Sequence, residues 1–497
     1  MAKAKKKEAL SLEEKLEQAL VPVDEQPYEV PENWCWVKLM NLCDDIIVPQ
    51  RDKPKKFDGD IPWCRIEDIE GKYLNGTLSN QYVTSEIVDA MNLRVCPEGA
   101  VICSCSASLG RQAILTRKCC TNQTFIGLVC NSKLLNNHYL YYYLMSLEQY
   151  FQTIGTGTTI KYISRNKFEQ LGVSLPSLLE QQRIVEQIES LFARLEEVKA
   201  KLEEALDEID KRTEIVLHNF FTGKYISDSC SDAVEQMLEE IVSCREQMIS
   251  RKEIQRAKVV PVSEQDKLMC IPQNWKQVKM GEIAFVTKLA GFEYTKYISL
   301  KEEGEVPVVR AQNVRKGYLN LNNVLYIDKK TSVLLERSAL KKKSLLITFI
   351  GAGIGDVCVF DKPERYHLAP NVAKVELFGD NILNAEYILY YLLSDIGQKE
   401  IFKSMKATAQ PSLSMETIRD IVIPIPEISV QNKIVDFISV IKEKELKEKE
   451  LIKNTLLQIE LMKKSILAKA FRGKLGTNNP DEESSLKLLK QIIAENM

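Results

Sequence analysis

Pro31-Glu32-Asn33-Trp34 occurs a second time in the chain, as Pro272-Gln273-Asn274-Trp275. The two asparagines are 241 residues apart, and residues 62–110 align without a gap on residues 307–355 at an offset of 245. An offset of this size is far longer than a solenoid repeat, which spans roughly 20–50 residues. We therefore interpret the chain as a tandem duplication in which each copy is a whole domain with its own connector.

The size and composition of the chain agree with this interpretation. At about 100–200 residues per domain, 497 residues predict several domains rather than a single core. Apolar residues make up 45% and charged residues 27% of the chain, which excludes collagen-like, mucin-like and wholly disordered proteins. The formal net charge is -2, so any polyanion has to be bound by a local basic patch.

The cysteines predict a reducing, cytoplasmic setting. They number 13 and lack the regular spacing of a secreted disulfide framework. The sequence has no apolar run of about 18 residues and no signal-peptide core, so we expect no membrane partner. Four cysteines of the first copy have poor spacing for zinc and no cysteine counterparts in the second copy, so we interpret them as buried small hydrophobes. They are Cys103, Cys105, Cys119 and Cys120.

Each copy opens with short apolar, β-branched runs that are broken by turn residues, and such runs predict strands. A helical stretch follows, at residues 139–150 in the first copy and 387–398 in the second. A closing strand comes next, at residues 171–175 and 421–425. This order predicts an α+β module with mixed strands in each copy.

A long amphipathic helix is predicted after each closing strand, from Gln182 and from Asn432. Apolar residues recur there at steps of four and three, which is a heptad pattern, and each helix ends in Phe-x-Gly-Lys. A continuous helix from Gln182 to Thr222 would be about 60 Å long, and two amphipathic helices of this kind should pack antiparallel to bury their stripes. The first seam is Ile184, Ile188, Leu191, Leu195, Val198, Leu202, Ala205 and Ile209.

The second seam departs from the first. Glu445 and Glu448 stand at the positions of Leu195 and Val198. We expect Leu446 and Leu451 to shift the contact stripe there.

The junction between strand and helix carries a family resemblance. The closing strand ends in a proline, and Glu180-Gln181-Gln182-Arg183-Ile184-Val185 then opens the heptad helix. Together with the duplicated Pro-x-Asn-Trp, the segment Gly155-Thr156-Gly157-Thr158-Thr159 and the Phe-x-Gly-Lys helix ends, this order resembles type I restriction-modification DNA specificity subunits. The resemblance covers nearly the whole chain. The second copy departs from the junction pattern, because Ser429-Val430-Gln431-Asn432-Lys433 lacks the paired Glu-Gln.

The resemblance implies that each α+β module is a target-recognition domain that reads one half of a bipartite, asymmetric site in double-stranded DNA. It also implies that the long helices fix the gap and dock two DNA methyltransferase subunits, and that restriction/translocase subunits complete the enzyme. S-adenosylmethionine, and ATP with Mg²⁺, would then bind to those partners, and this chain would be a non-catalytic DNA-recognition subunit.

The resemblance implies a fold of class α+β, with two similar target-recognition domains separated by a pair of long antiparallel coiled-coil helices. We predict seven segments. They are a basic tail with a short helix (1–30), target-recognition domain 1 (31–178), a central helical spacer (179–224), a linker with a short helix (225–271), target-recognition domain 2 (272–426), a distal helical spacer (427–475) and a C-terminal short helix (476–497).

Two other functions were weighed. Gly351-Ala352-Gly353-Ile354-Gly355-Asp356 looks like a nucleotide or S-adenosylmethionine loop, which would make the chain a stand-alone DNA methyltransferase. Only its last glycine recurs in the first copy, and a strand-like run follows where such a loop opens a helix, so we interpret a strand-to-strand turn. Neither an amino-methyltransferase motif nor a P-loop occurs in the sequence. A coiled-coil scaffold without DNA recognition is the second alternative.

Other polar groups receive no catalytic role. Glu70 and Lys72 are half of a nuclease-like pattern, but they align with Arg315 and Gly317, so we interpret a solvated turn. His138, His218 and His367 lie far apart in the sequence without ligand or triad spacing.

Residues shared by the two copies should build the fold, whereas residues that read different half-sites should differ. By this test Tyr73 and Tyr318, Gly110 and Gly355, and Trp34 and Trp275 are interpreted as structural. Arg65 and Arg310 are shared and suit either a phosphate contact or a buried ion pair. Both stay among the candidates for DNA binding.

The other candidates are polar and basic residues of unmatched loops, whose side chains suit bidentate or phosphate contacts. For any one of them a solvated loop is the alternative. They are Arg51, Lys53, Lys55, Lys56, Arg111, Gln112, Lys161 and Tyr162 in the first copy, and Lys288, Tyr294, Lys296, Lys406 and Gln410 in the second. A basic tail at Lys3, Lys5, Lys6 and Lys7 is expected to be disordered, with weak phosphate attraction at most.

Overall fold

The structure is a computed structural model that describes residues 11–49, 52–157, 160–226, 231–268, 271–379, 381–403 and 412–495. The chain divides into two compact units, one of residues 1–202 and 453–497 (unit 1) and one of residues 203–452 (unit 2). We call residues 31–178 the first head and residues 272–426 the second head. In the described ranges no helix combines the length and apolar character needed to cross a membrane.

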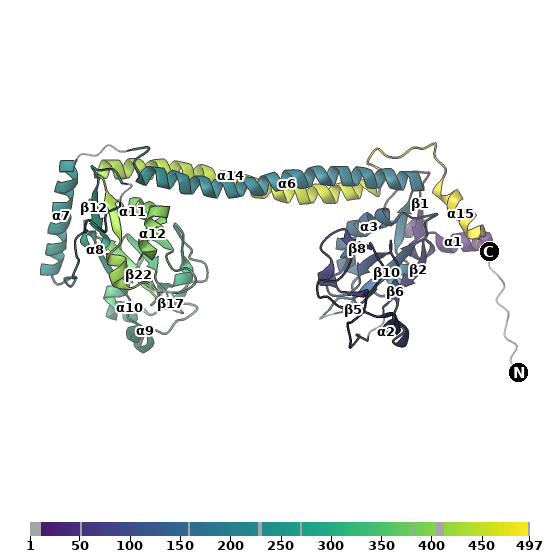
Figure 1. Ribbon diagram of the computed structural model, residues 1–497, viewed down its shortest axis with the longest axis horizontal. Helices are drawn as coiled ribbons and strands as arrows, with labels where there is room; N and C mark the ends of the chain where they lie inside the picture. The colour runs from purple at the N-terminus through teal and green to yellow at the C-terminus, as the bar shows by residue number, and fades with distance from the viewer. Residues whose placement is uncertain are drawn as a thin grey trace. The chain divides into compact units, whose positions relative to one another are not determined.

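Two long helices are shared by the units. Helix α6 (Leu178–Phe221) begins in unit 1 and ends in unit 2, whereas α14 (Ile428–Ala470) begins in unit 2 and ends in unit 1 (Figure 1). The division into units therefore cuts across both helices, and the seven predicted segments stay predictions.

The first head contains two small mixed sheets. One has the order β2 (Cys43–Ile47), β10 (Phe125–Cys130), β7 (Val101–Ser104), β8 (Gln112–Leu115) and β4 (Tyr73–Leu74). The other has the order β5 (Tyr82–Val83), β3 (Ile61–Cys64), β9 (Cys119–Thr121) and β6 (Val95–Cys96). The pairs β4–β8 and β3–β9 are parallel, and the other pairs are antiparallel.

The second head repeats this plan. One sheet has the order β13 (Ala284–Lys288), β22 (Val372–Leu377), β19 (Ser344–Thr348) and β20 (Val357–Phe360). The other has the order β17 (Leu325–Ile327), β14 (Val306–Val309), β21 (Tyr366–Leu368) and β18 (Ala339–Leu340), with β14 and β21 parallel. A hairpin joins β15 (Val314–Arg315) to β16 (Tyr318–Leu319). The predicted α+β module with mixed strands is confirmed.

A further strand pair ties the two ends of each head together. In unit 1, β1 (Cys35–Lys38) is antiparallel to the closing strand β11 (Gly172–Leu175). In unit 2, β12 (Lys276–Lys279) pairs with β23 (Val422–Ile425) in the same way. Each long helix follows directly from its closing strand, as the proline at the end of the strand predicted.

The single helix predicted inside each head is wrong, because two helices occupy that stretch. The first head has α3 (Asn137–Ser146) and α4 (Glu148–Ile154), and the second has α11 (Ala385–Leu393) and α12 (Asp395–Phe402). In the second head Ser394 takes an extended backbone, and its hydroxyl accepts a hydrogen bond from the Gly397 N–H at 3.1 Å. A serine in this conformation starts a new helix rather than continuing the old one.

The end of each long helix packs on the head of the other copy. In unit 1 the ring of Phe471 lies 5.2 Å from Tyr139 and 5.0 Å from Tyr143. In unit 2 Phe221 lies 5.5 Å from Tyr387 and 5.3 Å from Tyr391. The tyrosine hydroxyls donate to carbonyls of the closing strand in both heads, at 2.6 to 2.7 Å.

Glycine is required where each helix stops. Gly473 has φ +66, and a Cβ there would lie 2.4 Å from Cγ of Pro31. Gly223 has φ +71, and its Cβ would lie 2.4 Å from Cγ of Pro272. Any side chain would meet both a strained backbone and the proline ring. The duplicated Pro-x-Asn-Trp motif is thus one side of the contact that closes each head.

Within each unit the long helices pair antiparallel, as predicted. In unit 1 Lys463 donates to Glu196 at 2.5 Å, and in unit 2 Lys449 pairs with Asp210. The ring of Phe220 lies 5.2 Å from that of Phe437. Over these three pairs the residue numbers rise along α6 and fall along α14, so the two helices are antiparallel. The predicted seam is correct for Ile184, Ile188 and Ile209, which are buried, and wrong for Val198, which is 45% exposed.

The predicted shift of the second seam is wrong. Glu445 is buried in the seam, whereas Leu446 and Leu451 are each 68% exposed. Oε2 of this carboxylate accepts a hydrogen bond from the Thr213 hydroxyl at 2.7 Å, which offsets part of the cost of burying the group.

Three further helices flank the heads. Helices α1 (Leu12–Ala19) and α15 (Ser485–Glu495) contact each other in unit 1. Helix α7 (Ser231–Ser250) belongs to unit 2 and buries Val234, Met237 and Ile241. The basic tail predicted at residues 3–7 lies outside the described residues.

Candidate nucleic-acid interface

A glycine turn between two strands occupies the same place in both heads. In the second head it joins β19 to β20, which are antiparallel, so the predicted strand-to-strand turn is confirmed. Gly355 has φ +85, and its Cβ would lie 2.5 Å from Cζ of Phe402. Gly110 has φ +83, and its Cβ would lie 2.9 Å from Cδ2 of Phe151. Both glycines are structural, as interpreted.

In the first head this turn lies beside residues 155–157 and 160–163. The Ile163 N–H donates to the Cys105 carbonyl at 2.8 Å, and the Tyr162 N–H donates to the Thr156 carbonyl at 2.8 Å. Three predicted DNA-binding residues therefore share neighbouring loops and are exposed; they are Arg111, Lys161 and Tyr162.

Two of these cations are held by backbone carbonyls. Nη2 of Arg111 donates to the Ile69 carbonyl, and Nζ of Lys161 donates to the Gln152 carbonyl at 2.7 Å. Gln112 lies next to Arg111 but is buried on β8, so its placement in an unmatched loop is wrong. Arg111 and Gln112 also line a shallow cavity of about 280 Å³ together with Glu70, Tyr141 and Glu148.

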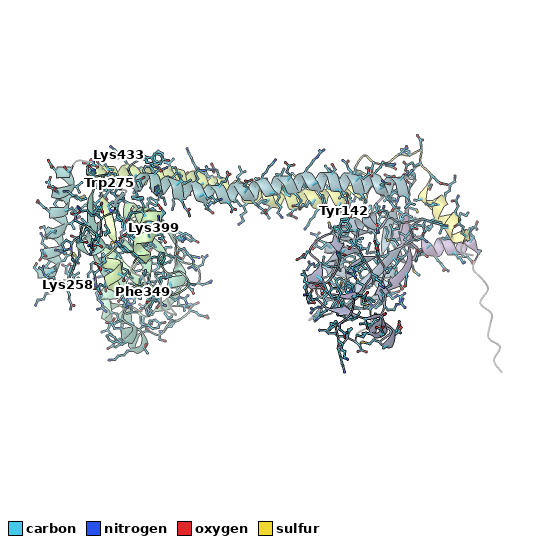
Figure 2. The ribbon with its side chains drawn as sticks, in the orientation of Figure 1. Tyr142, Lys258, Trp275, Phe349, Lys399 and Lys433 are labelled. Carbon is cyan, nitrogen blue, oxygen red and sulfur yellow. The ribbon has the colours of Figure 1, made fainter. Side chains whose placement is uncertain are left out.

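In the second head the corresponding turn is approached by Lys288 from β13. Its Nζ lies 4.7 Å from the ring centroid of Phe349, which Figure 2 labels. The Leu413 N–H donates to the Phe349 carbonyl at 2.9 Å, so the chain returns beside this turn as it does in the first head. Lys406 and Gln410, predicted in the segment before Leu413, lie outside the described residues.

Helices α2 (Ser85–Ala90) and α9 (Gly291–Tyr297) lie at the end of their heads that is farthest from the long helices (Figure 1). In the first head Lys53, Lys55 and Lys56 are exposed, and Lys53 lies 5.7 Å from the ring of Phe57, which packs against α2 (Ser85–Ala90). Arg51 lies outside the described residues. In the second head α9 (Gly291–Tyr297) carries half-buried Tyr294 and exposed Lys296.

Arg65 and Arg310 make the same local backbone contact. The Arg65 N–H donates to Oδ2 of Asp68 at 2.6 Å, and the Arg310 N–H donates to Oδ1 of Asn313 at 2.9 Å. Among the described residues, neither side chain forms a buried ion pair. Arg65 pairs at 3.1 Å with the exposed carboxylate of Glu67, and Arg310 donates to the carbonyl of Asn323 at 2.7 Å.

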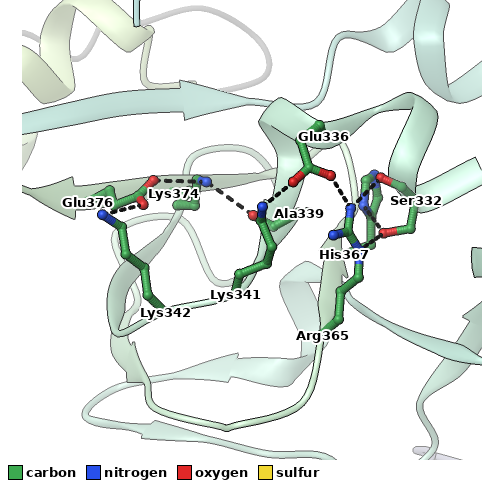
Figure 3. A network of polar contacts seen from close by, with 9 residues as sticks. All are labelled: Ser332, Glu336, Ala339, Lys341, Lys342, Arg365, His367, Lys374 and Glu376. Carbon is green, nitrogen blue, oxygen red and sulfur yellow. Dashed lines mark hydrogen bonds and ion pairs between the residues drawn. The ribbon is translucent and has the colours of Figure 1, made fainter. Parts of the chain in front are cut away.

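A polar network in the second head neutralises several of its cations (Figure 3). Glu336 on the loop after α10 (Lys329–Leu334) accepts from Lys341 and Arg365, and the Arg365 bond holds the pKa of Glu336 at about 2. Nε of Arg365 also donates to the Ser332 hydroxyl at 2.8 Å. These cations are satisfied within the head.

The same network encloses two buried bases. Lys374 lies 3.0 Å from Glu376 and donates to the Ala339 carbonyl at 3.0 Å. His367 is fully buried, its Nδ1 lies 3.2 Å from the Ser332 hydroxyl, and burial lowers its pKa to about 4. The network fixes α10 against β21, and β18 against β22, rather than offering free charge to a ligand.

Some surface groups were missed or misjudged from the sequence. Trp34 and Trp275 are buried as interpreted, but Tyr73 and Tyr318 are 52% and 59% exposed. An exposed aromatic residue that both copies share is suited to contact a partner that binds once to each copy. Its recurrence in both copies is visible in the sequence. The candidates for DNA binding also omit two pairs of exposed basic residues, although two adjacent cations in a turn or at a helix start are visible in the sequence. These are Arg117 with Lys118, and Lys329 with Lys330.

Two other predictions concern chemistry. The four cysteines of the first head are free and buried, as predicted, and burial raises the pKa of Cys105 to about 11 and that of Cys120 to about 12. The solvated turn predicted at Glu70 and Lys72 is wrong for Lys72. Its side chain is 17% exposed and forms an ion pair with Glu189 of α6.

Comparisons with known proteins agree with this architecture. The family model described as Type I restriction modification DNA specificity domain matches residues 31–207 and 272–460. The EcoBI specificity subunit of Escherichia coli is 23% identical, over 88% of this chain and 86% of its own length. The MjaIX specificity subunit of Methanocaldococcus jannaschii is 24% identical, over 84% of this chain and 88% of its own.

A solved structure from work on complex assembly of the type I R-M system has the same fold. It superposes with a TM-score of 0.62 at 17% identity, and covers 90% of this chain and 100% of its own. The two ranges matched by the family model hold one copy each and together exceed half of the chain. The chain therefore belongs to the type I restriction modification DNA specificity domain family.

Proposed function

We propose that the chain is the DNA-specificity subunit of a type I restriction-modification complex. Each head reads one half of a bipartite, asymmetric target, and the helices α6 and α14 fix the gap between the halves. Two DNA methyltransferase subunits dock on the chain, and restriction/translocase subunits complete the enzyme. The chain itself is not catalytic, and S-adenosylmethionine, ATP and Mg²⁺ bind to the partner subunits.

One observation carries this proposal: the two heads share their scaffold contacts and differ in the charged residue at the glycine turn. Tyr139 and Tyr387 donate to equivalent carbonyls of the closing strand. The residue after the shared glycine of the turn, by contrast, is Arg111 in the first head and Asp356 in the second. Two readers of one fold with different polar surfaces suit two different DNA sequences, because base edges are distinguished by donor and acceptor pattern.

The exposed residues that the copies share support a partner that is present twice. Tyr73 and Tyr318 are equivalent and exposed. The residues directly before them, Lys72 and Gly317, lie beside the long helices. A methyltransferase subunit that docks once per copy would meet the same aromatic ring on each. Aromatic residues are enriched at the centres of protein interfaces.

Methylation mapping of the host genome with and without this gene tests the proposal. Loss of methylation at a single bipartite motif is the expected result. An unchanged set of methylated motifs, in a host shown to express the complex, would contradict it.

The two alternatives make different predictions. A stand-alone methyltransferase would bind S-adenosylmethionine by itself, and titration calorimetry of the purified chain with this cofactor measures that directly. A scaffold without DNA recognition would leave duplex DNA unshifted in a gel even when the methyltransferase is present. The specificity subunit should show no cofactor binding alone and should shift DNA together with its partner.

A further inference from the structure

A partly buried lysine of the first head contacts α6. Lys72 forms an ion pair with Glu189 of α6. Its Nζ also lies 5.1 Å from the ring centroid of Tyr142, 5.3 Å from Tyr73 and 5.9 Å from Tyr141. The Tyr142 hydroxyl donates to Glu189 at 3.4 Å. A cation enclosed by aromatic faces and a carboxylate is bound more strongly than an exposed ion pair, because it is partly desolvated.

The second head meets α14 through a lysine of the helix instead. Nζ of Lys442 lies 5.0 Å from the ring centroid of Tyr390, a buried residue of α11. The head contributes Gly317 at this point, where a Cβ would lie 3.2 Å from Nζ of Lys442. The nearby carboxylate of Glu445 on the same helix favours the charged form of Lys442, against the lowering of its pKa by burial.

The duplication shows that these are the same junction with its parts exchanged. Tyr142 and Tyr390 are equivalent at an offset of 248, as are the scaffold tyrosines around them. Lys72 aligns with Gly317 at the offset of 245, and Phe192 aligns with Lys442 at the offset of 250. The ring of Phe192 lies 6.0 Å from Tyr142, where Lys442 approaches Tyr390. In one copy the head supplies the cation and the helix an aromatic ring, and in the other the helix supplies the cation and the head a glycine.

The carboxylate at each junction, like the lysine, comes from a different aligned position in each copy. Glu189 aligns with Ser439, and Glu445 aligns with Leu195. Each junction therefore keeps one lysine over the equivalent tyrosine and a carboxylate from the long helix, although neither charge stands at the same aligned position in both copies.

We propose that this lysine clamps each recognition head to its long helix and that the residue pairs Lys72 with Phe192 and Gly317 with Lys442 form a compatibility code between head and helix. The inference rests on the proposed function, because the clamp matters for DNA reading only if the helices set the gap. It assigns Lys72 and Lys442 as positioning residues for gap selection.

The code predicts which combinations of head and helix fit. The first head on the helix of the second copy would place Lys72 against Lys442, and the two cations would repel each other in a partly buried site. The second head on the helix of the first copy would place Gly317 beside Phe192 and leave the tyrosine without a cation. Heads can change places only if residue 192 or 442 changes with them.

Three variants of the full chain, assembled with its methyltransferase, test the clamp at the first junction. Lys72→Met removes the cation, Phe192→Lys adds a second one, and the double variant moves the single cation from head to helix, as in the second copy. Lys133→Met, which removes an exposed lysine of the same head, is the matched control. Lys72→Met is preferable to a glycine because it leaves the backbone freedom of the loop unchanged.

Hydrogen exchange of residues 70–74 and of α3 is the first measurement. Each single variant should exchange about tenfold faster there than the parent, and the double variant should return to within about threefold of it. The control should match the parent. A double variant that exchanges as fast as the singles would overturn the code.

Gap selection is the second measurement, and a merely structural lysine would not affect it. Duplexes carry the motif found by methylation mapping, with the native gap or a gap changed by one base pair. Each single variant should lower the ratio of native-gap to altered-gap methylation, and the double variant should restore it. An unchanged ratio in both singles would refute the positioning role. If the parent complex methylates no bipartite motif, the proposed function fails instead, and hydrogen exchange still decides whether the clamp exists.

Discussion

The ring of Phe471 lies edge-on to Tyr139, with centroids 5.2 Å apart, although the two residues come from opposite copies of the duplicated sequence. Phe221 and Tyr387, the equivalent pair in unit 2, have ring centroids 5.5 Å apart. Each head is thus closed by a helix end that the other copy supplies. Neither copy holds all the residues of its own core, so the two halves of the chain depend on each other for folding.

Replacing Phe471 by alanine should therefore destabilise unit 1 and leave unit 2 nearly unchanged. A fully buried phenylalanine truncated to alanine costs about 3–5 kcal/mol, and Phe471 is 1% exposed. Hydrogen exchange should accelerate in α3 but not in α11. The control is Leu461→Ala, at an exposed position of the same helix. Equal acceleration in both helices would contradict the crossed arrangement.

The crossed arrangement also shows where sequence analysis stops. Alignment of the copies located the heads, the closing strands, the glycine turns and the long helices, because each has a local pattern of apolar, proline and glycine residues. It did not place Phe471 on the first head, because packing between distant segments leaves no local periodicity. It also misplaced Lys72 and Glu445, whose burial depends on single partners, Glu189 and Thr213, far away in the sequence.

For the candidate DNA contacts, the sequence predicted which segments are loops but not which of their side chains are exposed. Gln112 reads as a polar loop residue beside Arg111, yet the strand β8 begins there and turns it inward. All four side chains of β8 are buried, so both faces of this strand are covered, whereas the sequence predicts a strand without showing how many of its faces are covered.

The buried histidine of the second head should make that head less stable in acid. His367 has a folded-state pKa of about 4, below its ordinary value of 6.5, mainly through burial and then through Arg365 and Lys374, while Glu336 opposes this. Its neutral form stabilises the fold fully above pH 6.5, and this contribution is lost as the pH falls towards 4. The loss should be on the order of 3 kcal/mol.

Urea unfolding of the parent and of His367→Asn at pH 7 and pH 4 measures this contribution. Asparagine does not titrate, so the variant should lose less stability than the parent over this interval, while the other acidic groups affect both proteins equally. Identical pH dependences would show that His367 is already protonated, or accessible, in the folded protein.

Lys55 and Lys56 should contact phosphate groups rather than base edges, since both are exposed lysines on the loop before β3. Each phosphate contact that is lost should reduce the slope of log binding constant against log salt by about 0.9. Fluorescence anisotropy of the complex with a duplex of the mapped motif, at several salt concentrations, gives that slope. The matched control is Lys201→Ala, an exposed lysine of α6. A double variant, Lys55→Ala with Lys56→Ala, that keeps the parent slope would remove these residues from the interface.

The antiparallel register of the long helices allows the gap to be changed without breaking their pairing. Glu196 pairs with Lys463, and Asp210 pairs with Lys449. The two pairs are 14 residues apart on both helices, so equal lengths of α6 and α14 face each other. Deleting residues 198–204 together with residues 455–461 removes one heptad from each helix and preserves the seam.

This matched deletion should shorten the preferred gap by about three base pairs, because seven residues span about 10 Å of helix and one base pair about 3.4 Å of DNA. Methylation of a duplex series with gaps varied one base pair at a time measures the preference. Deleting residues 198–204 alone shifts every following contact of α6 by seven residues against α14, so it should abolish methylation at all gaps. Retention of the native gap by the matched deletion would mean that the helices do not act as the ruler, because their length is the only quantity that this variant changes.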